Sequence, residues 1–285
     1  MLHKPQYINV NGKLMDLSVP KVMGIINVTP DSFYSGSRVT EGKTITDLVR
    51  KMTLDGADII DVGGYSSRPG AADVDITEEK ERVISAIRLI RSEFPEVVIS
   101  VDTFRSDVAL EAVKCGAAVI NDISAGDADK KMFDVVIDLN VPYIMMHMQG
   151  TPATMQKDPQ YDDVVADILR WAGKKITYLQ SKGVKDLIFD PGFGFGKTSA
   201  HNFEMLNRLT EFSVTGLPLL VGLSRKSMIW KNLGSTPDEA LNGTTVLNTV
   251  ALMKGADILR VHDVREAVET VKLFSRVKEA GGDLL

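Results

Sequence analysis

Polar residues close each of eight apolar segments of this chain. The first three segments end in Asn27, Asp61 and Asp102, and the others end in Asn121-Asp122, His147, Asp190, Ser224-Arg225-Lys226, and Arg260 with His262. A carboxylate accepts two adjacent N–H donors in a fixed orientation. Arg donates in a planar fork that suits phosphate. The set therefore predicts a site for a flat heterocycle rich in N–H donors that is joined to an anionic group.

The residue types divide between these two tasks. A lone aspartate after a strand can equally cap the next helix or bind loop amides, and a lone arginine commonly forms a surface ion pair. The functional interpretation therefore depends on all the strand ends meeting in one place. The candidates for the heterocycle are Asp102, Asn121, Asp190 and Lys226, and those for the anion are Arg68, Arg260 and His262.

The elements that must position these residues alternate along the chain. Short runs rich in Val and Ile, which are typical of parallel strands covered on both faces, are separated by amphipathic helical patterns such as 76–94 and 162–183. Eight such repeats in 285 residues predict one (β/α)₈ barrel (a TIM barrel), whose active site is built at the carboxyl ends of the strands. The predicted strands are 21–27, 57–64, 97–103, 117–122, 142–148, 186–192, 218–224 and 256–263.

The chain is predicted to be a single domain over residues 1–285, because no linker or low-complexity segment divides it. Residues 1–20 form an N-terminal extension. Within it, residues 7–17 alternate in polarity around Asn11-Gly12, which is a strong signal for a β-hairpin. We expect this hairpin to plug the bottom of the barrel.

Two loops carry further candidates for chemistry. The segment DPGFGFGKT (190–198) approaches two phosphate-binding motifs but has Pro191 and Lys197 where each requires a glycine. The polar loop 27–38 has the character of a lid at the barrel mouth. In it, Asn27 and Asp31 offer oxygen atoms of the kind that Mg²⁺ prefers, although either residue can instead form an Asx turn.

The composition of the chain limits the classes of partner that we expect for it. The net charge of −5 argues against nucleic acid as the main partner. No apolar run approaches the roughly 20 residues of a membrane helix, and the first residues lack the apolar core of a signal peptide. The single Cys115 excludes an internal disulfide and fits a reducing compartment. We therefore expect a soluble cytoplasmic protein that acts on small molecules, without nucleic acid or membrane partners.

The residues at the strand ends resemble those of the dihydropteroate synthase family, pterin-binding barrels of folate synthesis. The matching segments occur in order and cover nearly the whole chain. They are NVTPDSF (27–33), DVGGYSSRPGA (61–71), VDT (101–103), INDISAG (120–126), MHMQGTP (146–152), DPGFGFGKT (190–198), GLSRKSMI (222–229) and RVHDV (260–264).

The resemblance implies a transferase that joins 6-hydroxymethyl-7,8-dihydropterin pyrophosphate to p-aminobenzoate by SN1-like substitution at the pterin methylene. It also implies Mg²⁺ as the cofactor, inhibition by sulfonamides and a homodimer. The residues it implies for the pterin are Asp102, Asn121, Asp190 and Lys226; for pyrophosphate Asn27, Ser67, Arg68, Arg260 and His262, with Asn27 beside the metal; and for p-aminobenzoate Pro69, Phe195 and Ser227. Catalysis would fall to Asn27, Asp31, Arg68, Lys226, Arg260 and His262.

Three positions depart from the family pattern. Tyr65 stands where the family usually has Glu, Ser67 stands where it has Thr, and Ser35 replaces the second aspartate of the lid. Two alternatives follow from the shared pterin pocket: a corrinoid-linked folate methyltransferase and a non-catalytic pterin-binding barrel. The methyltransferase would not need the SRKSM and RVHDV segments, whereas the altered Tyr65 and Ser35 positions favour the non-catalytic barrel.

Overall fold

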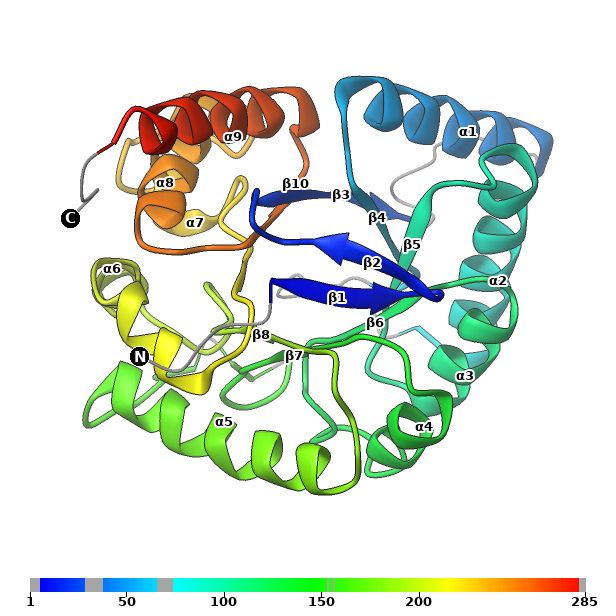
Figure 1. Ribbon diagram of the computed structural model, residues 1–285, viewed down its shortest axis with the longest axis horizontal. Coiled ribbons are helices and arrows are strands. Elements are labelled where there is room, and N and C mark those ends of the chain that lie inside the picture. Colours follow the sequence, from blue (N-terminus) through cyan, green and yellow to red (C-terminus); the bar gives the residue numbers. More distant parts are fainter. Residues whose placement is uncertain (1–5, 29–37, 66–73, 153, 156, 282–285) are drawn as a thin grey trace.

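Eight parallel strands form a closed barrel surrounded by helices. The computed structural model describes residues 6–28, 38–65, 74–152, 154–155 and 157–281, without the side chains of residues 38–43. The strands follow the order β8-β7-β6-β5-β4-β3-β10-β9, and a parallel bridge between Phe189 and Leu219 joins the two edges. Figure 1 shows the helices arranged around the strands. The predicted (β/α)₈ barrel is confirmed.

Each predicted strand is present, although most are shorter than the apolar run that signals them. β9 is the shortest because the chain turns away at Gly222 into the loop that carries Lys226. The barrel strands are β3 Lys21–Asn27, β4 Ile59–Gly63, β5 Val98–Asp102, β6 Val119–Asp122, β7 Tyr143–Met146, β8 Leu187–Asp190, β9 Leu220–Val221 and β10 Ile258–Val261.

Helices follow the strands, as the alternating pattern predicts. They are α1 Arg38–Asp55, α2 Ile76–Glu93, α3 Ser106–Lys114, α4 Met132–Leu139, α5 Val164–Ser181, α6 Ser199–Asn207, the 3₁₀ helix η2 Leu209–Thr215, α7 Ser227–Trp230, α8 Leu241–Met253 and α9 Val264–Glu279. In the part of the chain that the structure describes, none of these helices is both long and apolar enough to span a bilayer.

The two helices predicted in detail show why the sequence folds this way. α2 buries Val83, Ile87 and Ile90, which are spaced so that they lie on one face. The side chain of its N-cap, Asp75, accepts the Thr77 amide, which satisfies an N–H that lacks a partner within the helix. After α5, Gly183 has a φ of 90°, the left-handed conformation that glycine adopts at little cost.

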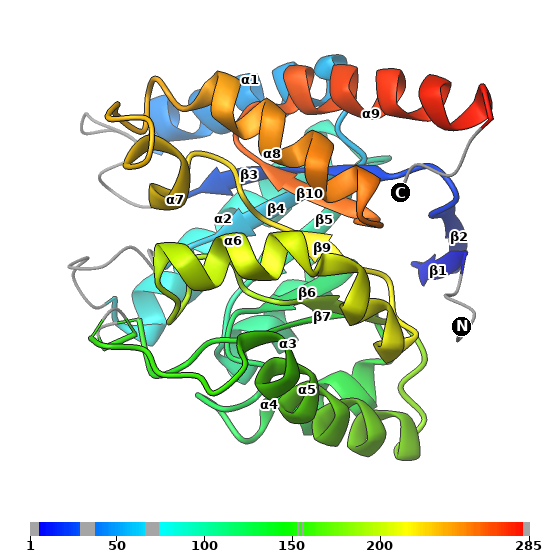
Figure 2. The same cartoon turned by 90° about the vertical axis from the view of Figure 1, so that its left-hand side faces the viewer.

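The N-terminal hairpin closes one end of the barrel. Its strands are β1 Tyr7–Val10 and β2 Lys13–Asp16, joined by Asn11 and Gly12 with φ values of 52° and 78°. Ile8 and Val10 are buried in a cluster with residues near the start of the barrel strands, which are Met23, Ile59, Val119, Ile144, Ile188, Leu220 and Ile258. Figure 2 shows the hairpin at the end opposite the arrowhead of β3. The predicted plug is confirmed.

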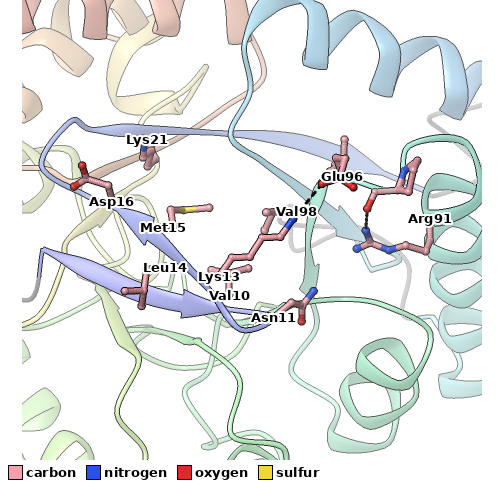
Figure 3. A pocket seen from close by; sticks show the side chains of 12 residues that line it. Val10, Asn11, Lys13, Leu14, Met15, Asp16, Lys21, Arg91, Glu96 and Val98 are labelled. Carbon is pink, nitrogen blue, oxygen red and sulfur yellow. Dashed lines mark hydrogen bonds and ion pairs between the residues drawn. The ribbon is translucent and has the colours of Figure 1, made fainter.

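A groove of about 390 Å³ lies between the hairpin and the start of β5 (Figure 3). Its charged side chains bind neighbouring protein groups: Lys13 lies 3.2 Å from Glu96, and Arg91 donates to the Pro95 carbonyl at 2.6 Å. The groove is therefore a seam where the hairpin meets the barrel. The strand-end residues lie at the other end of the molecule.

We predict that Ile8→Ala lowers the free energy of unfolding by about 2–5 kcal/mol, because it leaves a cavity at the centre of the plug. Ile8 is 1% exposed. Denaturant unfolding should show the loss as a lower midpoint. Leu14→Ala is the matched control, because Leu14 lies on the same hairpin and is 70% exposed; it should change stability by less than about 0.5 kcal/mol. Equal losses in the two variants would contradict the plug.

Candidate functional site

Strand register brings the predicted polar residues to one end of the barrel. Asn27 pairs with Gly63 on the next strand, Gly63 pairs with Asp102, and Asp102 pairs with Asn121. Asp190 is the last residue of β8, and Arg260 is the third residue of β10. Because all eight strands are parallel, these side chains meet at the carboxyl end of the barrel, away from the hairpin.

Arg260 links two carboxylates inside the barrel mouth. Its Nε donates to Asp61 Oδ2 at 2.7 Å, and its Nη2 donates to Asp102 Oδ2 at 2.5 Å. Asp61 Oδ2 also accepts from Asn121 Nδ2 at 3.0 Å. Asp61 is fully buried and the Arg260 side chain is 19% exposed. Four strands thus contribute to one hydrogen-bonded array that fixes the orientation of Arg260 and Asn121.

Burial shifts the pKa values of several charged groups at the barrel mouth. Burial raises the pKa of Asp102 to about 7, Arg260 opposes that rise, and the nearby carboxylates of Asp61 and Glu79 add to it. Burial also raises the pKa of Asp190, against the pull of Lys226. The ammonium of Lys226 responds in the opposite sense, because burial lowers its pKa to about 8. The mouth therefore holds acid and base groups that titrate close to physiological pH.

Lys226 lies beside the loop that follows β8. Its Nζ donates a short hydrogen bond to the carbonyl of Phe193 and stands 4.8 Å from the centre of the Phe195 ring. Phe193 is fully buried in the core, whereas Phe195 is half-buried. The two phenylalanines of DPGFGFGKT therefore have different positions: Phe193 packs in the core, and Phe195 faces the ammonium in a cation–π arrangement.

The glycines of this loop permit close contact with the loop that follows β7. Gly192 has a φ of 75°, and a Cβ there would lie 1.9 Å from the His147 carbonyl oxygen. Gly196 has a φ of 64°, and its Cβ would lie 2.4 Å from the Gln149 carbonyl oxygen. Only glycine fits either position. Lys197, which the phosphate-loop motif would place on a phosphate, is 3% exposed and points into this contact.

The last two strands contribute a histidine and the turn before α7. Ser224 Oγ accepts the backbone N–H of His262 at 3.1 Å and lies 3.0 Å from the ring Nδ1, to which its hydroxyl can donate. When the hydroxyl donates to Nδ1, the ring N–H lies on Nε2. Arg225, at a φ of 55°, forms a bidentate pair with Asp263 at 2.7 and 2.9 Å and so fixes the turn that carries Lys226. Ser227 follows at the start of α7 and is exposed.

Asn27 offers one half-buried amide at the end of β3. Within the described ranges, no three His, Cys, Asp or Glu side chains gather closely enough to hold a metal ion. A neutral oxygen at the rim fits a hard cation such as Mg²⁺, which usually takes most of its ligands from substrate phosphates and water. Asn27 is therefore a described residue that could contribute one ligand to such a cation.

Four predicted site residues, Asp31, Ser67, Arg68 and Pro69, lie outside the described residues, as does Ser35. Tyr65 is the described residue directly before the range 66–73, which contains Ser67, Arg68 and Pro69. Its ring meets Phe104 edge-on with centroids 5.1 Å apart, and the guanidinium of Arg105 lies 5.5 Å from the Tyr65 ring and 5.3 Å from the Phe104 ring. Arg105 also donates to the buried carboxylate of Glu79 at 2.7 Å. An aromatic and cationic stack thus occupies the position where the family resemblance implies an acid.

Three residues of the site were not predicted from the sequence. Asp61 was noted only as a strand end, and its bridging role follows from the register of β4 against β5. Glu79 is fully buried and accepts from Thr103 Oγ1 at 2.7 Å. A signal for it was available, because it lies four residues before Val83 on the apolar face of α2. The sequence marks Lys197 only by its place in a segment that approaches two phosphate-binding motifs.

We predict that Arg260→Met destabilises the protein by about 3–5 kcal/mol at pH 8, because it leaves buried carboxylates without a counter-charge. Without the guanidinium, the pKa of Asp102 should rise further above 7. Native Asp102 then binds a proton that the unfolded chain does not, so the stability of the variant relative to the parent falls as pH rises through 7.

Denaturant unfolding at pH 5.5 and pH 8 measures this difference, and the loss should be smaller at pH 5.5. Arg276→Met is the matched control. Arg276 is 81% exposed and pairs with Glu279 at 2.8 Å, so its removal should cost less than about 1 kcal/mol at either pH. An equal loss at both pH values for Arg260→Met would contradict the buried charge array.

Comparison with known proteins agrees with this geometry. The family model described as "Pterin binding enzyme" matches residues 23–262. The dihydropteroate synthase of Escherichia coli K12 is 46% identical over 274 residues, which are 94% of this chain and 95% of the relative. The Haemophilus influenzae synthase is 42% identical over 272 residues, covering 95% and 98%.

Solved structures give the same result. The Yersinia pestis dihydropteroate synthase in complex with a sulfonamide drug superposes with a TM-score of 0.90 at 39% identity, covering 96% of this chain and 100% of that one. The Xanthomonas albilineans enzyme with 4-aminobenzoic acid gives 0.89 at 38% identity, covering 96% and 98%. The chain therefore belongs to the dihydropteroate synthase family of pterin-binding transferases.

Proposed function

We propose that this protein condenses 6-hydroxymethyl-7,8-dihydropterin pyrophosphate with p-aminobenzoate to form 7,8-dihydropteroate and pyrophosphate. The observation that carries the proposal is the group of side chains that meet at the barrel mouth, which are Asp102, Asn121, Asp190, Lys226 and Arg260. The chain that carries them belongs to this family. Structures of the relatives support it, since their titles name a sulfonamide drug, a product and 4-aminobenzoic acid.

In this proposal the pterin ring occupies the mouth between β5, β6 and β8. Asp190 accepts from the ring's adjacent N–H donors in a paired geometry, while Asn121 and Asp102 hold the opposite edge. Lys226 donates to a ring oxygen or nitrogen. The hydrogen bonds of Arg260 and Asn121 to Asp61 support these roles, because they set side-chain orientation before the substrate enters.

The pyrophosphate arm would point toward the rim formed by β3 and β10. Arg260 and His262, with Ser67 and Arg68, supply donors to it, and the Nε2–H of His262 suits this task. Asn27 would hold Mg²⁺ together with the pyrophosphate oxygens. When bound, Mg²⁺ supplies positive charge to the leaving group. Asp31 of the lid remains a candidate catalytic residue of the same rim.

The incoming amine would approach along the loop after β8. Phe195 offers a ring face to the flat p-aminobenzoate, while Pro69 and Ser227 border the pocket. The half-buried position of Phe195 beside Lys226 supports this assignment. Phe193 is excluded from it because it is buried in the core.

The proposed mechanism is a loose substitution at the pterin methylene. The C–O bond breaks and its electron pair leaves with pyrophosphate, while the electron-rich dihydropterin shares the positive charge of the methylene. The amine lone pair then forms the C–N bond, and the amine loses one proton. The protein contributes by stabilising the departing anion and by positioning the amine, so no protein nucleophile is needed.

We predict that the purified protein releases pyrophosphate from the pterin substrate in the presence of Mg²⁺ only when p-aminobenzoate is present, with dihydropteroate formed in equal amount. Coupled detection of pyrophosphate and chromatography of the pterin product measure this. EDTA should abolish release, and sulfonamides should compete with p-aminobenzoate. Pterin binding without turnover would instead support the non-catalytic barrel, and methyl transfer to a corrinoid would support the methyltransferase.

The proposed protein is a cytoplasmic homodimer that pairs through its C-terminal helices. Val246 on α8 is 52% exposed, and Leu273 and Val277, one turn apart on α9, are 70% and 57% exposed. The two helices pack against each other (Figure 1), and each of them exposes large apolar side chains to solvent. A second copy of the chain is the partner that the family resemblance implies for it.

We predict that Leu273→Glu converts the dimer to a monomer, because it buries an unpaired charge in the contact. Light scattering coupled to size-exclusion chromatography at micromolar concentration measures the mass. Tyr178→Glu is the control, because Tyr178 is 43% exposed on α5, which lies across the barrel from α9 (Figure 1); it should leave the mass unchanged. A parent protein that is already monomeric would refute the dimer without affecting the proposed reaction.

A further inference from the structure

Lys197 is a buried lysine that the proposed mechanism does not use. Its Nζ lies 2.9 Å from the carbonyl oxygens of Gly192 and Phe195, 3.0 Å from His147 Nδ1 and 3.3 Å from the His147 carbonyl. Burial and the neighbouring ammonium lower the pKa of His147 to about 2, so its ring is neutral and Nδ1 can accept. Burial also lowers the pKa of Lys197 well below its usual value. The N–H donors of its amino group all have acceptors inside the protein.

These contacts belong to a loop whose carbonyls are satisfied one by one by side chains. Phe193 O accepts from Lys226, Gly196 O accepts from the Tyr161 hydroxyl at 2.7 Å, and Lys197 O lies 3.4 Å from Asn202 Nδ2. Asn202 Oδ1 also accepts the Gly194 amide at 2.7 Å. Lys197 binds two carbonyls in the middle of the loop, those of Gly192 and Phe195, whereas Asn202 binds the two at its end, those of Lys197 and Thr198.

The position of Lys197 decides what the loop presents on its other side. Gly192 and Phe195 flank Phe193, so holding both of their carbonyls on one ammonium turns the Phe193 carbonyl outward to Lys226. The same constraint places the Phe195 ring under the Lys226 ammonium. The close approach of Gly192 to the His147 carbonyl leaves the loop little room for another path.

We propose that Lys197 is a positioning residue for the p-aminobenzoate half of the site. It touches no substrate; it acts by fixing the loop conformation that places the Phe195 ring and the Phe193 carbonyl against Lys226. This rests on the proposed function, in which Phe195 borders the p-aminobenzoate pocket. The lysine of DPGFGFGKT thus has its ammonium directed inward, to loop carbonyls rather than to a phosphate.

The test is Lys197→Met, which keeps the length of the side chain and removes its donors. We expect the KM for p-aminobenzoate to rise by about tenfold or more. The dissociation constant of the pterin pyrophosphate, measured by calorimetry, should stay close to that of the parent protein. Asn202→Ala removes the other brace of the loop without removing a charge. It should also raise the KM for p-aminobenzoate. This variant tests the same inference if Lys197→Met does not fold.

Lys175→Met is the matched control. The Lys175 amino group also binds a backbone carbonyl, that of Ala125 at 2.7 Å, and its side chain is 14% exposed. It pairs with Asp127 and reaches His147 only indirectly, through the Trp171 ring. It should lower the melting temperature without changing the ratio of the two substrate constants. If Lys197→Met raised both constants equally, or neither, the positioning role would be wrong.

Hydrogen exchange separates this inference from the proposed reaction, because it needs no turnover. In Lys197→Met, the amides of Gly194 and Phe195 should exchange faster while the barrel strands keep their parent rates. If the parent protein lacked synthase activity but the loop amides responded in this way, the reaction would fail and the loop assignment would stand. Uniformly faster exchange throughout the barrel would contradict the positioning role, because it would show that Lys197 stabilises the fold as a whole.

Discussion

The contact of Arg260 with Asp61 and Asp102 is the interaction on which the site depends. Buried carboxylates are costly unless they are paired and hydrogen-bonded, and this barrel buries several of them at one end. Arg260 comes from β10, crosses β3 in the strand order and reaches β4 and β5. The same contact therefore offsets the cost of burying these carboxylates. It also connects the last strand of the chain to the first half of the barrel.

The two ends of the barrel divide stability from chemistry. At the amino ends of the strands, Ile8 and Val10 of the hairpin complete an apolar cluster. At the carboxyl ends, burial raises the pKa values of Asp102 and Asp190 and lowers that of Lys226. The apolar end stabilises the fold, so the polar end can be optimised for binding rather than for packing.

The fold and most of the site's location could be predicted from the sequence, because both depend on local patterns. Alternating apolar runs indicate the barrel, and the residue that ends each run indicates its mouth. The partnership of Asp61 with Arg260 could not be predicted in this way, since the two are 199 residues apart and meet only through strand register. The sequence motif also does not predict the direction of the Lys197 side chain, because that direction depends on the carbonyls that surround it.

The stack of Tyr65, Phe104 and Arg105 has a consequence for how such a chain diverges from its relatives. Each of the three contacts the other two, and Arg105 is further committed to Glu79. A guanidinium can serve either kind of neighbour, because it stacks on a ring face and also pairs with a carboxylate. An acid placed at position 65 would therefore meet a cation already in position, and the exchange would replace a cation–π contact with an ion pair.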